Sequence, residues 1–155
     1  MSYYDRTPRI NEDGARGFAT VQDDDDQAEV ARVLEAAWSC RLRPFGYFSP
    51  IDYYAERDGT IVGLVEIKCR SHEAARYPDV FLNLRKWLAL TLGESGVGVP
   101  GIFAVGFQDG VRFVRATEVA GAKVEMGGCL RRVKSTSDVE PVFRVPISLM
   151  QEIEA

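Results

Sequence analysis

The segment that most constrains the fold of this chain runs from Thr60 to Lys68. Its first residues are β-branched or apolar on both faces, which is typical of a buried central strand. Glu66 and Lys68 break this pattern at the end of the segment. Because they are two residues apart on a strand, their side chains leave one face, while Ile67 points into apolar packing on the other. Burying a charged pair costs free energy, so Glu66 and Lys68 are candidates for function.

A second strand, over residues 51–56, predicts an antiparallel hairpin with this segment. A two-residue turn would place Asp52 on the wrong face of the hairpin. A three-residue loop, Arg57-Asp58-Gly59, with its glycine in the left-handed conformation beside a bulge, places Asp52 opposite Leu64. Asp52 then lies diagonal to Glu66 at roughly 7–8 Å, which lets both carboxylates bind one ion.

Such an arrangement predicts a metal site and a hydrolytic reaction. The carboxylates of Asp52 and Glu66, with the backbone carbonyl of Ile67, form a set of hard oxygen ligands suited to Mg²⁺ or Mn²⁺. A bound ion of this kind polarises a phosphate oxygen and lowers the pKa of a water molecule. The Lys68 ammonium can orient or help to deprotonate that water and can stabilise the developing negative charge. The pattern therefore predicts cleavage of a phosphodiester bond.

The rest of the chain predicts two helices and further strands. Apolar residues at helical spacing indicate a helix over 27–40 with Asp26 as its N-cap. A second helix is expected over 79–92, capped by Asp79, followed by a glycine-rich connection over 93–101. Further strands are expected at 102–107, 111–116 and 142–145, the first two joined by the hairpin turn Gln108-Asp109-Gly110, and a short helix from residue 147. The second helix should bury one apolar stripe, formed by Phe81, Leu84 and Leu88. This order predicts an α/β fold in which a mixed β-sheet is flanked by helices.

The length of 155 residues suits one domain. We expect an irregular N-terminal arm over residues 1–22 and a single domain over residues 23–155. The net charge of −4 is unevenly distributed, because residues 1–35 hold nine acidic and four basic side chains. The main body can therefore carry a basic surface. The basic cluster of Arg131, Arg132 and Lys134 could bind phosphates, although a solvated loop is the simpler interpretation.

The three cysteines and the single histidine are spaced too widely to indicate a zinc site, and free thiols in a reducing compartment are expected. These residues are Cys40, Cys69, Cys129 and His72. No apolar run is long enough to span a bilayer, and the N-terminus is polar and acidic. We therefore expect a cytoplasmic protein with no membrane partner.

The segment from Asp52 to Lys68 resembles the PD-(D/E)xK nuclease superfamily. The family's Asp corresponds to Asp52 and its Glu-x-Lys to Glu66-Ile67-Lys68, and the expected element order is similar over residues 27–107. One departure is that Ile51 separates Pro50 from the Asp, whereas the family motif has Pro directly before it. The resemblance implies a restriction-endonuclease-like core and Mg²⁺- or Mn²⁺-dependent hydrolysis of DNA. It also implies a phage or mobile-element enzyme, acting in the cytoplasm of the host.

The resemblance also implies two further catalytic residues. Glu35 corresponds by placement to a Glu that many members carry on the first helix, although its helix face also carries Arg32, as on a solvated stripe. Lys86, one turn after Asn83, corresponds to a polar residue that members often place beside the active site. A solvent-facing Lys next to Arg85 is the alternative.

Two other functions stay open. The chain could be a nucleic-acid-binding or assembly protein that has this fold and does not cut, although intact Asp52, Glu66 and Lys68 argue against it. A plain α/β interaction module would leave the Glu66/Lys68 pair on a buried strand unexplained. A homodimer would suit cutting of both DNA strands, but no residue in the sequence indicates an interface. Endonucleolytic and exonucleolytic cutting both remain open.

Overall fold

Six strands form the central sheet of the computed structural model, which describes residues 9–10, 16–17, 21–46, 49–128 and 139–154. Their order across the sheet is β11-β8-β7-β5-β4-β3. The pair β5–β7 is parallel and the other neighbours are antiparallel, so the sheet is mixed, as predicted. The strands are β3 (Arg41–Pro44), β4 (Tyr53–Arg57), β5 (Thr60–Cys69), β7 (Gly101–Phe107), β8 (Gly110–Arg115) and β11 (Gln151–Glu152).

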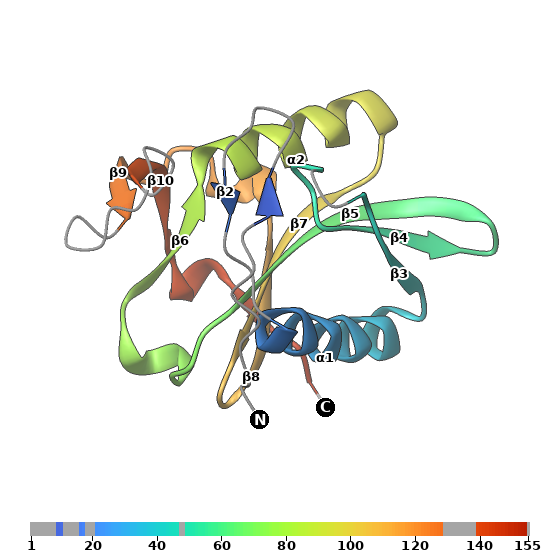
Figure 1. Cartoon of the computed structure of the whole chain (residues 1–155), viewed down its shortest axis with the longest axis horizontal. Helices are drawn as coiled ribbons and strands as arrows, with labels where there is room; N and C mark the ends of the chain where they lie inside the picture. Colours follow the sequence, from blue (N-terminus) through green and yellow to red (C-terminus); the bar gives the residue numbers. More distant parts are fainter. Residues whose placement is uncertain (1–8, 11–15, 18–20, 47–48, 129–138, 155) are drawn as a thin grey trace.

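Two helices, α1 (Val21–Trp38) and α2 (Leu84–Val97), lie on opposite sides of this sheet, with β5 and β7 between them (Figure 1). Helix α1 buries an apolar stripe that includes Leu34 against Ile67 of β5. Helix α2 buries Leu90 against Leu64 on the other face of the same strand. Strand β5 is therefore covered on both faces, which explains why its central residues are apolar on both.

A second, smaller sheet packs over the face of β5 that carries Glu66 and Lys68. It consists of β6 (Asp79–Asn83), β10 (Val139–Pro146) and β9 (Val124–Gly128), in the order β6-β10-β9. Its apolar residues, such as Leu82 and Val145, join a core cluster with Phe103 and Val105 of β7. Phe103 and Val105 are the register partners of Glu66 and Lys68, so they share a face with them. The two charged residues therefore lie where the second sheet meets the first.

Short elements connect and flank the two sheets. Three 3-10 helices, η1, η2 and η5, span Ala74–Arg76, Ala116–Val119 and Ile147–Leu149. The two-residue strands β1 (Arg9–Ile10) and β2 (Arg16–Gly17) pair in the segment expected to be an arm. The boundary predicted between arm and domain stays a prediction. Cys129 and the basic cluster of Arg131, Arg132 and Lys134 lie outside the described residues.

The expected helix over 79–92 was wrong at both ends. Residues 79–83 form strand β6, because Val80 and Leu82 are buried with the alternation of a strand and pair with β10. Helix α2 then continues to Val97, so it takes up the first half of the expected glycine-rich connection. The predicted stripe also fails, since Leu88 is 52% exposed. Helix α1 begins at Val21, so Asp26 lies inside it and is not its N-cap.

The hairpin between β4 and β5 has a different turn from the one expected. Arg57 pairs with Thr60, so the turn has two residues, Asp58-Gly59, both with positive φ (52° and 76°), as in a type I′ turn. A bulge at Ala55/Glu56 then shifts the register by one residue, and Tyr53 pairs with Val65. The predicted three-residue loop was wrong, and so was the predicted pairing of Asp52 with Leu64, which pairs with Tyr54. The bulge nevertheless restores the face on which Asp52 approaches Glu66.

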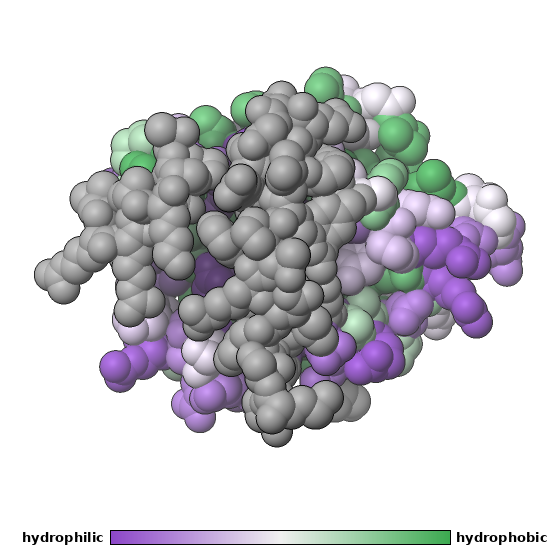
Figure 2. All heavy atoms as spheres, viewed as in Figure 1, coloured by the Kyte–Doolittle hydropathy of each residue, from purple (hydrophilic) through white to green (hydrophobic). Residues whose placement is uncertain are grey.

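The outer face of α2 carries exposed apolar side chains. Figure 2 shows apolar side chains along the upper edge of the molecule, over α2, and the exposed residues of this helix include Leu88, Leu92 and Val97. Within the described ranges, no helix combines the length and the hydropathy needed to cross a bilayer.

Candidate active site

Asp52 is held against the strand that carries the other candidate residues. It lies directly before β4, and its Oδ2 accepts a hydrogen bond of 3.0 Å from the backbone N–H of Ile67. Its own backbone carbonyl accepts from the N–H of Phe45 at 3.0 Å. The side-chain contact occurs beyond the last β4–β5 ladder pair, which joins Tyr53 to Val65. Asp52 is thus fixed beside Glu66 and Lys68 from both its backbone and its side chain.

Glu66 is a buried carboxylate beside Asp52, and Lys86 of α2 contacts both. Glu66 is only 7% exposed. The Lys86 Nζ lies 3.2 Å from Glu66 Oε2 and 3.6 Å from Asp52 Oδ1. Burial, and next the charge of Asp52, raise the pKa of Glu66 to about 8, and the nearby Lys86 ammonium opposes this rise. The structure therefore brings Asp52, Glu66 and Lys86 together in one site.

Lys68 leaves β5 on the same face as Glu66 and reaches the junction of β6 and α2. Its Nζ donates to the backbone carbonyl of Phe81 at 3.1 Å and to Asn83 Oδ1 at 3.4 Å. Asn83 in turn donates through Nδ2 to Glu140 of β10. Burial, and next the charge of Arg70, lower the pKa of Lys68 to about 8. The ammonium of Lys68 is therefore easier to deprotonate than that of an exposed lysine.

Helix α1 contributes Gln27, which the sequence analysis missed. Its Nε2 lies 3.3 Å from the backbone carbonyl oxygen of Ile67, to which it donates. Because the N–H and C=O of one strand residue point the same way, this carbonyl lies on the side of β5 that faces Asp52. A signal did exist, since Gln27 stands three, four and seven residues before the buried Val30, Ala31 and Leu34, on the apolar face of the helix.

Glu35 has a structural contact. Its Oε2 accepts a hydrogen bond of 3.0 Å from the backbone N–H of Leu42, and its carbonyl accepts from the N–H of Cys40 at 3.3 Å. These bonds hold the connection from α1 to β3. No hydrogen bond or ion pair described for Glu35 joins it to Asp52, Glu66 or Lys68. Its catalytic role stays a prediction without support from the geometry.

The donor atoms at this site suit a hard cation. In the part of the chain that the structure describes, no group of three or more His, Cys, Asp or Glu gathers as a metal site. Asp52 and Glu66 supply two carboxylates, and the Ile67 carbonyl supplies a neutral oxygen. Mg²⁺ commonly uses one or two carboxylates and keeps several waters, so this small oxygen set fits it. The Lys86 ammonium lies within 3.6 Å of both carboxylates, so one positive charge already contacts the pair.

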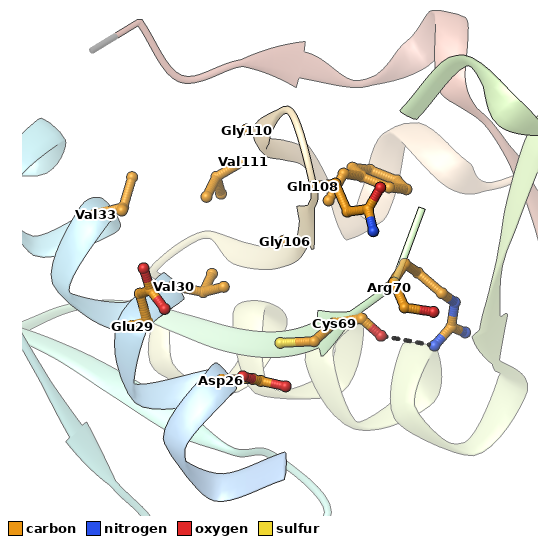
Figure 3. A pocket seen from close by; sticks show the side chains of 12 residues that line it. Asp26, Glu29, Val30, Val33, Cys69, Arg70, Gly106, Gln108, Gly110 and Val111 are labelled. Atoms are coloured by element: carbon orange, nitrogen blue, oxygen red, sulfur yellow. Dashed lines mark hydrogen bonds between the residues drawn. The ribbon is translucent and has the colours of Figure 1, made fainter. Parts of the chain in front are cut away.

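A pocket of about 660 Å³ lies at the end of β5, between this strand and α1 (Figure 3). Asp26 and Glu29 of α1 line one side, and Cys69 and Arg70 follow Lys68 on another. The Arg70 guanidinium donates to the Cys69 carbonyl at 3.1 Å. Cys69 points to the opposite face of β5 from Lys68, so the pocket lies on the α1 side of the sheet and does not enclose Asp52 or Glu66.

Comparisons with known proteins agree with the expected fold and with the expected family. A family model described as "Phage putative PDDEXK endonuclease" matches residues 15–153. Among solved structures, the Holliday junction resolvase Hjc of Archaeoglobus fulgidus is similar, with a TM-score of 0.52 and 16% identity over 82% of this chain and 91% of the resolvase. No curated protein matches the sequence significantly. At this identity the resolvase supports the fold alone, which is restriction-endonuclease-like, as predicted. The family match spans nearly the whole chain, and the chain therefore belongs to the family of phage PD-(D/E)xK endonucleases.

Proposed function

We propose that this protein hydrolyses phosphodiester bonds of DNA and requires Mg²⁺ or Mn²⁺ bound by Asp52, Glu66 and the backbone carbonyl of Ile67. The observation that carries the proposal is the convergence of two carboxylates on one cationic group, Lys86 Nζ, at distances of 3.2 and 3.6 Å. Holding a buried carboxylate, Glu66, beside the half-buried carboxylate of Asp52 costs free energy, which a function explains. Membership of a nuclease family supports the same reading.

Each residue has a distinct role in this proposal. Asp52 and Glu66 would bind the cation. When bound, the cation would polarise a phosphate oxygen and lower the pKa of a water molecule. Lys68 stands on the same face of β5 as Glu66, with its ammonium held by Phe81 and Asn83. From there Lys68 can accept or donate a proton near neutral pH, because its pKa lies at about 8. Gln27 positions the Ile67 carbonyl.

DNA is proposed as the substrate because the family is one of phage endonucleases, which would act in the cytoplasm of the infected cell. The similarity in fold to a Holliday junction resolvase is a reason to include four-way junctions among the substrates tested. Cutting both strands of a duplex or junction would suit a homodimer, and sedimentation with and without DNA would test this.

The test compares cleavage of linear, circular, branched and single-stranded DNA, and of RNA, with Mg²⁺, Mn²⁺ or a chelator. The variants are Glu66→Gln and Lys68→Met, which keep the approximate size of each side chain. The matched control is Glu56→Gln, because Glu56 lies in the same hairpin and pairs with Arg43 away from the site. We expect metal-dependent cleavage that both site variants lose and the control retains.

Two results would contradict the proposal. Cleavage that survives in Glu66→Gln would place the active site elsewhere. Binding of DNA without cleavage under any metal condition would favour the alternative of a non-cutting nucleic-acid-binding or assembly protein on this fold.

A further inference from the structure

Lys86 is held against the two candidate metal-binding carboxylates. It lies in the first turn of α2, which packs over the face of β5 that carries Glu66. Its side chain is only 18% exposed, and its ammonium contacts one oxygen of Glu66 and one of Asp52. The side chain of the preceding residue, Arg85, is 62% exposed, and its Nε lies 3.7 Å from Glu140 Oε2. Two adjacent cations on one helix therefore have different partners.

The contacts of Lys86 are with the same two carboxylates that would bind the metal. Two carboxylates close together repel each other, and the repulsion is strong where one of them is buried. An ammonium between them compensates this repulsion, and so would a divalent cation. Both cations cannot contact the same pair of carboxylates at once without repelling each other at short range.

We propose that Lys86 is a tethered cation that competes with the divalent metal for Asp52 and Glu66, so that metal binds only when the Lys86 ammonium moves away from them. This inference rests on the proposed function. It makes Lys86 a positioning residue that sets how tightly the carboxylate pair binds metal. The displaced ammonium also stays close to the site, where it is available to a phosphate group.

The test measures Mn²⁺ binding by calorimetry in the full chain without DNA, at pH 8.5, where Glu66 is mostly ionised. Lys86→Met removes the charge and keeps most of the apolar stem. Arg85→Met is the matched control, because it removes an equal charge one residue away that contacts neither Asp52 nor Glu66. We expect Lys86→Met to bind Mn²⁺ about tenfold more tightly or better, since the lost contacts are close and partly buried. The control should change affinity by less than about twofold, because its exposed charge is screened.

A second readout separates competition from a general effect on folding. Without metal, Lys86→Met should melt at a lower temperature than the wild type, because Glu66 and Asp52 lose their cation. Saturating Mn²⁺ should raise its melting temperature by more than it raises that of the wild type. If Lys86→Met fails to fold, Lys86→Gln takes its place in both measurements.

The outcomes distinguish this inference from the proposed function. The inference would be overturned if Lys86→Met bound Mn²⁺ no more tightly than the wild type. The metal site would still stand if the wild type bound Mn²⁺ and Asp52→Asn abolished that binding. An equal gain in affinity for Arg85→Met would also overturn it, because the effect would then be remote repulsion. If neither the wild type nor Lys86→Met bound Mn²⁺, both the inference and the metal-dependent function would fail.

Discussion

The Asp52 side chain accepts a hydrogen bond of 3.0 Å from the backbone N–H of Ile67, the residue between Glu66 and Lys68. One carboxylate oxygen of Asp52 thus completes the edge of β5, while the other faces Lys86. The same side chain therefore contributes to the fold and to the candidate metal site, and substitutions can separate the two contributions.

Replacing Asp52 by Ala should destabilise the protein more than replacing it by Asn. The Ala variant leaves the partly buried Ile67 N–H without its acceptor, which costs about 1–3 kcal/mol, whereas Asn retains a carbonyl oxygen. Both variants should lose metal-dependent cleavage. Urea unfolding without metal, followed by circular dichroism, measures the difference. Equal stability of the two variants would show that the hydrogen bond contributes nothing.

Stability should depend on pH through Glu66. Its pKa rises from an ordinary 4.5 to about 8 on folding, so between these values the folded state binds more protons than the unfolded state. The contribution of Glu66 to stability is therefore fully present below pH 4.5 and is lost as the pH rises through about 8. The loss cannot exceed about 1.4 kcal/mol per pH unit for one proton.

The measurement is the free energy of unfolding from pH 5 to 8.5, for the wild type and Glu66→Gln. The wild type should lose stability relative to the variant across this range. Lys68 affects stability at higher pH. Its pKa falls from 10.5 to about 8 on folding, so the free energy of unfolding rises as the pH increases between those two values. Parallel curves for wild type and Glu66→Gln would contradict the raised pKa.

Metal affinity should increase with pH up to about 8. Glu66 must lose its proton to bind a cation, and its pKa of about 8 means that the proton is present at neutral pH. Each pH unit below 8 should weaken Mn²⁺ binding by up to about tenfold, and binding should release a proton. Calorimetry in buffers of different ionisation enthalpy measures the released proton. Affinity that stays constant from pH 6 to 8 would show that Glu66 binds metal without losing a proton.

Replacing Gly101 by Ala should destabilise the packing of α2 on the sheet. A Cβ at this position would lie 2.7 Å from the backbone oxygen of Leu90, and backbone atoms cannot move aside cheaply. We expect a loss of about 1–3 kcal/mol in urea unfolding. The control is Gly96→Ala, where a Cβ meets nothing within 4 Å, and which should gain about 0.5–1 kcal/mol as a helix substitution. A neutral Gly101→Ala would mean that α2 shifts freely on β7.

Glu35→Gln tests whether the first helix contributes a catalytic carboxylate. The bond from the Leu42 N–H predicts a structural role, so the variant should lose about 1 kcal/mol or less and keep its cleavage rate. Cleavage assays under saturating Mn²⁺ and urea unfolding give the two readouts. A loss of cleavage of a hundredfold or more at unchanged stability would instead place Glu35 in the active site.

Several features could be predicted from the sequence because they depend on local geometry. Glu66 and Lys68 share a face because side chains on a strand alternate, whatever surrounds it. The hairpin from β7 to β8 follows from its turn residues, Gln108 and Asp109 between paired Phe107 and Gly110. The mixed sheet between helices follows from the order of elements. The first two features need only contacts between neighbours in the chain, and the third was predicted from the order of locally encoded elements.

Other features depend on contacts between distant segments, and the tertiary structure decided them. Phe81 has helical spacing with Leu84 and Leu88, but residues 79–83 form a strand because β10, some sixty residues later, offers a ladder of hydrogen bonds. Lys86 reached the carboxylates only once α2 packed on β5, so no periodicity could distinguish it from Arg85. The motif was thus encoded locally. The charge environment of the site, which governs its protonation, arises instead from the packing of separate elements around a buried carboxylate.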